Sequence, residues 1–173
     1  MDHQKATLLI PVELQVRELD AKLLLACIAA RRGFQSIIGP RREMHFHIPS
    51  FPRSIYLSKS VTNASRGVFR TLRGLGHEIV AWDKEALVHL PSETYYQRRI
   101  FPDTLKYVSG LLAWGEENAE LWRKYPQLPS NLKIHITGNP RGDLMRSEMR
   151  SLYDTDVKKL QNTYGNFILI NTN

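Results

Sequence analysis

The feature that most constrains the fold is a regular alternation of short apolar segments with helical segments. Thr7–Val12 (TLLIPV) is a continuous apolar run, which is typical of a strand buried on both faces. Val16–Arg32 has the spacing of an amphipathic helix, which predicts that Cys27 is buried on its apolar face, and Gly33 is a usual helix end. Phe34–Ile38 then predicts a second strand. This order favours a right-handed βαβ unit.

The alternation continues along the rest of the chain. Further strands are predicted at Ser54–Leu57, Glu78–Trp82, Gly110–Ala113, Lys133–Thr137 and Phe167–Thr172. Helices are predicted at Asn63–Leu75, Pro91–Arg99, Pro102–Tyr107 and Glu116–Tyr125, and over parts of Leu144–Tyr164. Such an order predicts the α/β class, with a Rossmann-like, mostly parallel sheet that carries helices on both faces.

The end of the chain suggests a domain boundary. Residues 145–166 are mostly polar and are interpreted as a helical connector, whereas residues 167–173 (FILINTN) have the pattern of a buried strand. Because a domain rarely finishes on a core strand, we expect residues 1–144 to form one domain and residues 167–173 to begin a second, truncated domain.

The positive charge is concentrated in the first half of the chain. The net charge is +7, and residues 1–75 carry 12 Lys and Arg against 5 Asp and Glu. Anionic partners fit this excess: a nucleotide, a phosphorylated lipid, an acidic sugar or an anionic membrane surface. No basic face interleaved with aromatic residues and no nucleic-acid motif is present, so nucleic acid is not an expected partner.

Location is inferred from what the sequence lacks. There is no stretch of eighteen apolar residues and no secretory signal pattern, and a single cysteine excludes a disulfide within the chain. These features favour a cytoplasmic protein. The basic first half adds the option of peripheral contact with the inner membrane.

Ligands of open parallel sheets bind at the carboxyl ends of the strands, so the loops that follow the strands supply the candidates. The predicted substrate-binding residues are polar residues or glycines in these loops: Glu13, Arg17, Asp20, Lys59, Ser60, Gly138, Asn139 and Arg141. Two alternatives stay open. Arg17 and Asp20 are three residues apart and can pair on the helix surface. The segment GNPRGD either presents backbone N–H groups to an anion or forms a plain tight turn.

Two carboxylates follow the predicted strand that ends at Trp82. Asp83 and Glu85 lie in the segment WDKE, and a carboxylate at this position can act as the general base that takes the proton of an attacking hydroxyl. Asp83 and Glu85 are therefore the candidate catalytic residues. Ordinary capping or a surface charge is the alternative.

Metal and cofactor motifs are sparse. His45 and His47 bracket Phe46, and in an extended segment both rings would lie on one face, but no third ligand lies nearby, so no metal site is predicted. The chain has no P-loop and no GxGxxG after the first strand. No cofactor is therefore expected in this part of the protein.

Several ordered blocks resemble a known family. They are VRELDAKLLLA, SIYLSKS, LGHEIVAWDKEALV, LLAWGEEN, TGNPRGDLM and FILINTN. Together the blocks resemble bacterial surface carbohydrate (surface polysaccharide) biosynthesis proteins. TGNPRGD also looks like a turn of two-domain glycosyltransferases and non-hydrolysing sugar-nucleotide epimerases of the GT-B architecture. This resemblance implies an amino-terminal domain on the acceptor side, a carboxyl-terminal domain that binds the nucleotide-sugar donor, and chemistry without a metal.

Three hypotheses follow. In the first, the full protein transfers a sugar from a nucleotide-activated donor to a glycan or lipid-linked acceptor, and this part alone is inactive. The second is an epimerase of the same architecture, which needs no acceptor. The third is a non-enzymatic α/β binding module.

Overall fold

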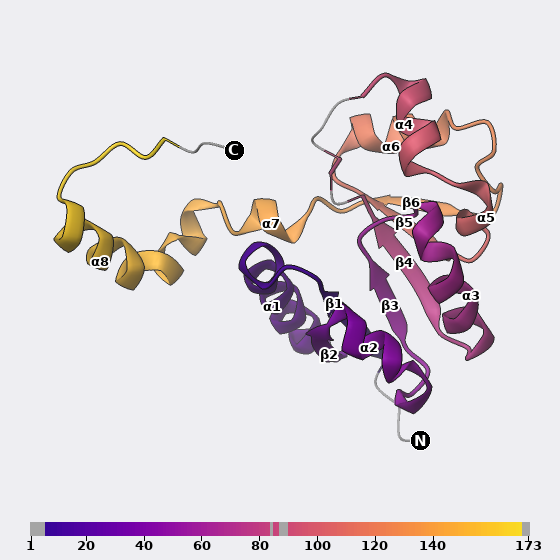
Figure 1. Cartoon of the computed structure of the whole chain (residues 1–173), viewed down its shortest axis with the longest axis horizontal. Helices are drawn as coiled ribbons and strands as arrows, with labels where there is room; N and C mark the ends of the chain where they lie inside the picture. The colour runs from indigo at the N-terminus through magenta and orange to yellow at the C-terminus, as the bar shows by residue number, and fades with distance from the viewer. Residues whose placement is uncertain (1–5, 84, 87–89, 171–173) are drawn as a thin grey trace.

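The protein is built on a six-stranded sheet whose strands are all parallel (Figure 1). The computed structural model describes residues 6–83, 85–86 and 90–170. The strands are β1 (Thr7–Val12), β2 (Gln35–Pro40), β3 (Ile55–Ser58), β4 (Glu78–Trp82), β5 (Gly110–Ala113) and β6 (Lys133–Ile136), in the spatial order β2-β1-β3-β4-β5-β6. The α/β class predicted from the alternation is confirmed.

Strand β1 lies inside the sheet, and the strand order reverses there. All six of its residues are buried, and Leu9 is paired with Ile37 of β2 on one side and with Tyr56 of β3 on the other. The chain therefore leaves β1 toward one edge of the sheet, and returns past it to place β3 on its opposite side.

Helices cover both faces of the sheet. The α-helices are α1 (Gln15–Arg31), α2 (Arg41–Phe46), α3 (Arg66–Gly74), α4 (Ser92–Arg99), α5 (Pro102–Leu105), α6 (Glu116–Arg123), α7 (Pro140–Asp143) and α8 (Asp154–Tyr164), with 3-10 turns η1 (Ile48–Ser50), η2 (Asn63–Ser65) and η3 (Ser147–Tyr153). Because successive side chains of a strand point to opposite faces, β1 contributes to two cores. Leu9 joins the larger core with Phe69 of α3 and Trp122 of α6, whereas Ile10 packs beneath α1.

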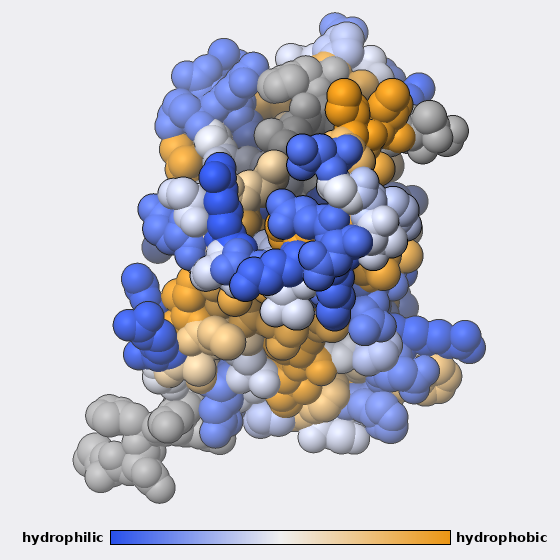
Figure 2. Space-filling view, turned by 90° about the vertical axis from the view of Figure 1, so that its left-hand side faces the viewer, coloured by the Kyte–Doolittle hydropathy of each residue, from blue (hydrophilic) through white to orange (hydrophobic). Residues whose placement is uncertain are grey.

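Helix α1 corrects the predicted burial of Cys27. Cys27 is exposed, and the side of the helix that faces the sheet carries Ala21 and Ala29 instead. The segment LLLACIAA is apolar almost all round, so its pattern does not single out the inner face. Figure 2 shows apolar side chains in its lower half, where α1 lies. Even so, no helix in the described part of the chain is long and apolar enough to cross a membrane.

The segment MHFHIP is not extended, which corrects a second expectation. His45 lies in helix α2, and His47 is the residue at which this helix ends. Residues two apart on a helix point in different directions, so the two rings do not share a face as they would on a strand. Helix α2 has no clear apolar periodicity, because it is short and mostly polar.

Residues after α7 extend away from the sheet. Helix α8 stands apart from the strands in Figure 1, and the rings of Tyr164 and Phe167 meet edge to face at a centroid distance of 5.8 Å. Residues 167–170 of the predicted strand Phe167–Thr172 are exposed and have no strand geometry within the described part of the chain. Their assignment as the first strand of a second domain stays a prediction. Residues 171–173 lie outside the described residues.

Exposure of Cys27 leads to a direct chemical prediction. We expect the native protein to react with one equivalent of the thiol reagent DTNB without denaturant, because the side chain lies on the outer surface of α1. Absorbance of the released thiolate measures the reaction, and Cys27→Ser is the blank. A thiol that reacts only after unfolding would contradict this placement.

A buried histidine leads to a prediction about stability and pH. His77 is 1% exposed, and its Nδ1 accepts a hydrogen bond from the Ser54 N–H at 3.2 Å. Burial lowers the pKa of His77 below the usual 6.5, so the unfolded chain binds this proton more readily than the folded protein. The free energy of unfolding should therefore fall as the pH drops below 6.5, by up to about 1.4 kcal/mol per pH unit for one proton.

Chemical denaturation between pH 7.5 and 5 measures this slope. We expect His77→Gln to flatten the slope, although it also lowers the overall stability. Arg70→Gln, which removes an exposed charge on α3, should keep the slope of the parent protein. Equal slopes for the parent and His77→Gln would contradict the assignment.

Candidate functional site

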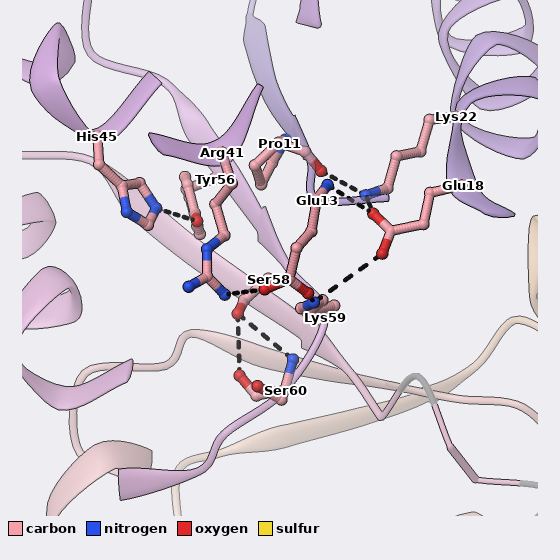
Figure 3. A network of polar contacts seen from close by, with 10 residues as sticks. All are labelled: Pro11, Glu13, Glu18, Lys22, Arg41, His45, Tyr56, Ser58, Lys59 and Ser60. Carbon is pink, nitrogen blue, oxygen red and sulfur yellow. Dashed lines mark hydrogen bonds and ion pairs between the residues drawn. The ribbon is translucent and has the colours of Figure 1, made fainter. Parts of the chain in front are cut away.

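The reversal at β1 opens a crevice at the carboxyl edge of the sheet. Helix α1 follows β1 on one face, whereas α2 follows β2 on the other face, so the two helices diverge beside the ends of β1 and β3. Such a switch in strand order is where open α/β sheets bind their ligands. Here it brings together polar residues from the ends of β1, β2 and β3 (Figure 3).

Glu13 is held between two cations at the end of β1. Its carboxylate forms an ion pair with Lys59, which follows β3, and a second with Arg41 of α2 at 3.1 Å (Figure 3). Its backbone N–H donates to Glu18 Oε2 of α1 at 3.0 Å. Glu13 therefore connects the first turns of α1 and α2 to the end of β3.

Glu18 and Lys22 extend this network along α1. Lys22 Nζ pairs with Glu18 and also donates to the backbone carbonyl of Pro11 in β1, while Lys59 Nζ lies 3.9 Å from Glu18 Oε1. The side chains of Lys22, Lys59 and Glu18 are at most 20% exposed. In such a setting each charge needs its partner, because removing one would leave the others desolvated and uncompensated.

A pocket of about 80 Å³ lies beside this network, between α1 and the sheet. We call it the tryptophan pocket, because Trp82 and Trp114 at the ends of β4 and β5 line it. Its other apolar and polar lining residues include Ile10, Leu25, Leu57, Arg17, Glu18, Lys59, Asn139 and Arg141. The indole N–H of Trp114 is buried and has no hydrogen-bond acceptor among the described residues. An apolar wall with a few polar groups is typical of a small-molecule site.

A left-handed glycine brings the last loop to this pocket. Gly138 has φ of +74°, a conformation that favours glycine, and it lies two residues after the end of β6. The Asn139 side chain then accepts from the Arg141 N–H at 3.0 Å, and α7 packs against α1. Asn139 therefore already caps the Arg141 N–H, which favours the tight-turn alternative at that residue.

A second pocket lies on the other side of Glu13. We call it the histidine pocket, and its lining residues include Glu13, Arg41, His45, Tyr56, Ser58 and Ser60. His45 Nε2 and the Tyr56 hydroxyl are hydrogen-bonded at 2.7 Å (Figure 3). Burial raises the pKa of Tyr56, whereas burial and the Arg41 charge lower the pKa of His45. Both side chains are therefore neutral at pH 7.

Most of the predicted substrate-binding residues meet around these pockets. Arg17, Lys59, Asn139 and Arg141 line the tryptophan pocket, and Glu13, Lys59 and Ser60 line the histidine pocket. Asp20 lines a neighbouring depression together with Arg17 and Arg141, and it forms no ion pair with Arg17 among the described residues. Gly138 contributes through its backbone turn.

The two candidate catalytic carboxylates are held elsewhere. Asp83 is buried, and its two oxygens accept hydrogen bonds from the Tyr95 hydroxyl at 2.8 Å and from the Glu85 N–H at 3.0 Å. Glu85 forms an ion pair with Arg99 of α4. These contacts favour a structural role for Asp83, and the catalytic assignment of both residues stays a prediction.

Sequence reasoning missed several residues of the site. Glu18, Lys22, Tyr56 and the two tryptophans were not among the candidates. Trp82 and Trp114 each stand at the carboxyl end of a predicted strand. This position could have indicated both residues, because ligands bind at that edge of a parallel sheet. No group of three or more His, Cys, Asp or Glu residues that would hold a metal is present in the described residues.

Comparisons with known proteins add little to this geometry. No family model and no curated protein matches the chain. One similar solved structure is an ABC sugar transporter subunit from Rhodobacter sphaeroides 2.4.1, with 13% identity and a TM-score of 0.39. The match covers 94% of this chain and 65% of that protein.

The contacts of Asp83 lead to a stability prediction. Tyr95 donates to Asp83 and accepts from the Trp122 indole N–H at 2.8 Å, inside the larger core. Tyr95→Phe leaves both partners without this hydroxyl and should lower the free energy of unfolding by about 1–3 kcal/mol. Urea denaturation measures the change, and Tyr107→Phe, at a partly buried tyrosine, is the matched control. A change below about 0.5 kcal/mol would argue against a structural Asp83.

Proposed function

We propose that this chain is a carbohydrate-binding α/β domain that serves the acceptor side of a glycosyltransferase of surface polysaccharide synthesis. A nucleotide-activated sugar would be the donor, and a glycan or lipid-linked sugar the acceptor. The single observation that carries the proposal is the tryptophan pocket at the switch in strand order. The ordered sequence blocks that resemble surface carbohydrate biosynthesis proteins support the same function.

The tryptophan side chains suit a sugar ring. One face of a pyranose carries mostly C–H groups, and an aromatic ring offers a large apolar surface with little loss of side-chain entropy. Trp82 and Trp114 both line the pocket above the apolar residues Ile10 and Leu57. Burying a sugar face there removes apolar area from water.

The polar lining residues suit the edge of the same sugar. Hydroxyl groups both donate and accept hydrogen bonds, and the pocket offers donors in Asn139 and Trp114 and an acceptor in Glu18. The unpartnered indole N–H of Trp114 is a donor that a ligand oxygen can satisfy. Such a mixture of stacking and directed polar groups fixes the orientation of a ligand.

Glu18 is the carboxylate that a hydroxyl in this pocket would meet. It lines the pocket and is held in place by Lys22, whereas Asp83 is occupied by Tyr95. We therefore assign to Glu18 the hydrogen bond that orients the acceptor hydroxyl. Asp83 and Glu85 stay the sequence-based candidates for the base.

A non-enzymatic carbohydrate-binding module is the second candidate. The commitment of Asp83 to Tyr95 favours it, because a module needs the pocket but no base. Both candidates bind a carbohydrate, but only the glycosyltransferase transfers a sugar to it. Formation of a longer glycan from a nucleotide-sugar and a bound acceptor would separate them.

Binding of saccharides tests the shared step. We expect Trp82→Ala and Trp114→Ala each to weaken the binding of a glucose- or galactose-containing oligosaccharide about tenfold, since roughly 1.4 kcal/mol of stacking is lost. Titration calorimetry of the purified chain measures this change. The control is Tyr164→Ala, which removes an exposed aromatic side chain on α8, far from the pocket.

Intrinsic fluorescence gives an independent readout. The chain has three tryptophans, of which Trp122 is 1% exposed and the other two line the pocket. A bound saccharide should shift the emission of the parent protein and protect it from acrylamide quenching. Failure of a broad saccharide panel to bind, or binding by both tryptophan variants that is as tight as that of the parent protein, would contradict the proposed function.

A further inference from the structure

We infer that the tryptophan pocket takes a phosphorylated sugar, with Arg17 and Arg141 holding the phosphate. This inference rests on the proposed function, because it specifies the ligand of the same pocket. It adds a charge requirement that a neutral glycan would not meet.

Two of the four cations that line the pocket are neutralised by the protein itself. Lys22 pairs with Glu18, and Lys59 pairs with Glu13 and lies near Glu18. Arg17 and Arg141 form no ion pair within the described residues. The pocket therefore keeps two guanidinium groups whose charge no carboxylate of the described chain compensates.

These two arginines come from elements that pack together. Arg17 lies in the first turn of α1 and Arg141 lies in α7, which packs against α1. Both residues line the tryptophan pocket, and both line the adjoining depression that contains Asp20. They therefore occupy one stretch of the pocket rim, within reach of a ligand whose ring rests on the tryptophans.

The surroundings strengthen this positive charge. The apolar pocket wall has a low dielectric constant, so a charge at its rim acts on a ligand more strongly than one in open water. Glu18, the acidic residue that lines the tryptophan pocket, is paired with Lys22, and Asp20 lies in the depression, outside the tryptophan pocket. A planar guanidinium also matches phosphate oxygens through two parallel hydrogen bonds.

Helix-start N–H groups do not explain the site. Asn139 accepts from the Arg141 N–H, and α7 has only four residues, so recognition of the anion falls to side chains. The pocket thus combines a surface for a sugar ring with two free guanidinium groups. A hexose phosphate, free or as the first sugar of a phosphate-linked lipid, presents both features.

Calorimetry of the purified chain with four probes tests the inference: glucose 1-phosphate, methyl glucoside, uridine monophosphate and inorganic phosphate. We expect glucose 1-phosphate to bind at least tenfold more tightly than each of the other three. Its affinity should fall as sodium chloride is raised from 50 to 500 mM, because the contact is ionic. The affinity for methyl glucoside should change little.

Variants locate the phosphate. Arg17→Gln and Arg141→Gln should each lower the affinity for glucose 1-phosphate at least tenfold more than the affinity for methyl glucoside, and so remove most of the preference between the two ligands. Arg70→Gln is the matched control, because Arg70 is also exposed and unpaired among the described residues but lies on α3, against the opposite face of the sheet. Thermal unfolding of each variant shows that the fold is kept.

The outcomes separate this inference from the proposed function. Equal affinity for glucose 1-phosphate and methyl glucoside overturns the phosphate site and leaves the carbohydrate pocket standing. An affinity for uridine monophosphate or inorganic phosphate equal to that for glucose 1-phosphate also overturns it, since the pocket would then not recognise the sugar. Binding of none of the sugars, while the tryptophan variants behave as the parent, overturns both.

Discussion

The rest of the structure depends on the pairing of β1 with strands on both of its sides. All six residues of β1 are buried, and its alternating side chains enter two separate cores. The reversal of strand order at β1 sends α1 and α2 to opposite faces of the sheet. Apolar packing therefore closes both faces but not the carboxyl edge between the two helices, and polar residues at the strand ends occupy that crevice.

The charges at this edge divide into two groups with different physical roles. Lys59 contacts both Glu13 and Glu18, and Lys22 contacts Glu18 and a carbonyl of β1, so these residues fasten the first turn of α1 to the ends of β1 and β3. Desolvation of these ions is offset only by their partners. Arg17 and Arg141 at the rim are exposed and form no ion pair with the described residues, so their charges do not hold these elements together.

Much of the fold follows from local pattern, but the composition of the site does not. All six strands of the sheet were predicted from their apolar runs, to within two residues at each end. Helix α2 was not predicted, because it is short and mostly polar. The inner face of α1 was not predicted either, because the segment LLLACIAA of this helix is apolar almost all round. That Arg17 and Arg141 line the same pocket depends on the strand order, which no single segment of the sequence encodes.

Strand geometry explains why the carboxylate of the WDKE segment is separated from the pocket. Successive side chains alternate between the faces of a strand, and Trp82 lines the pocket on the α1 side. Asp83 therefore turns to the opposite side, where Tyr95 of α4 meets it. Moving Asp83 into the pocket would need a one-residue slip of β4, which would also turn Ile79 and Ala81 out of the larger core. The same alternation that supplies the aromatic wall thus excludes the adjacent acid from it.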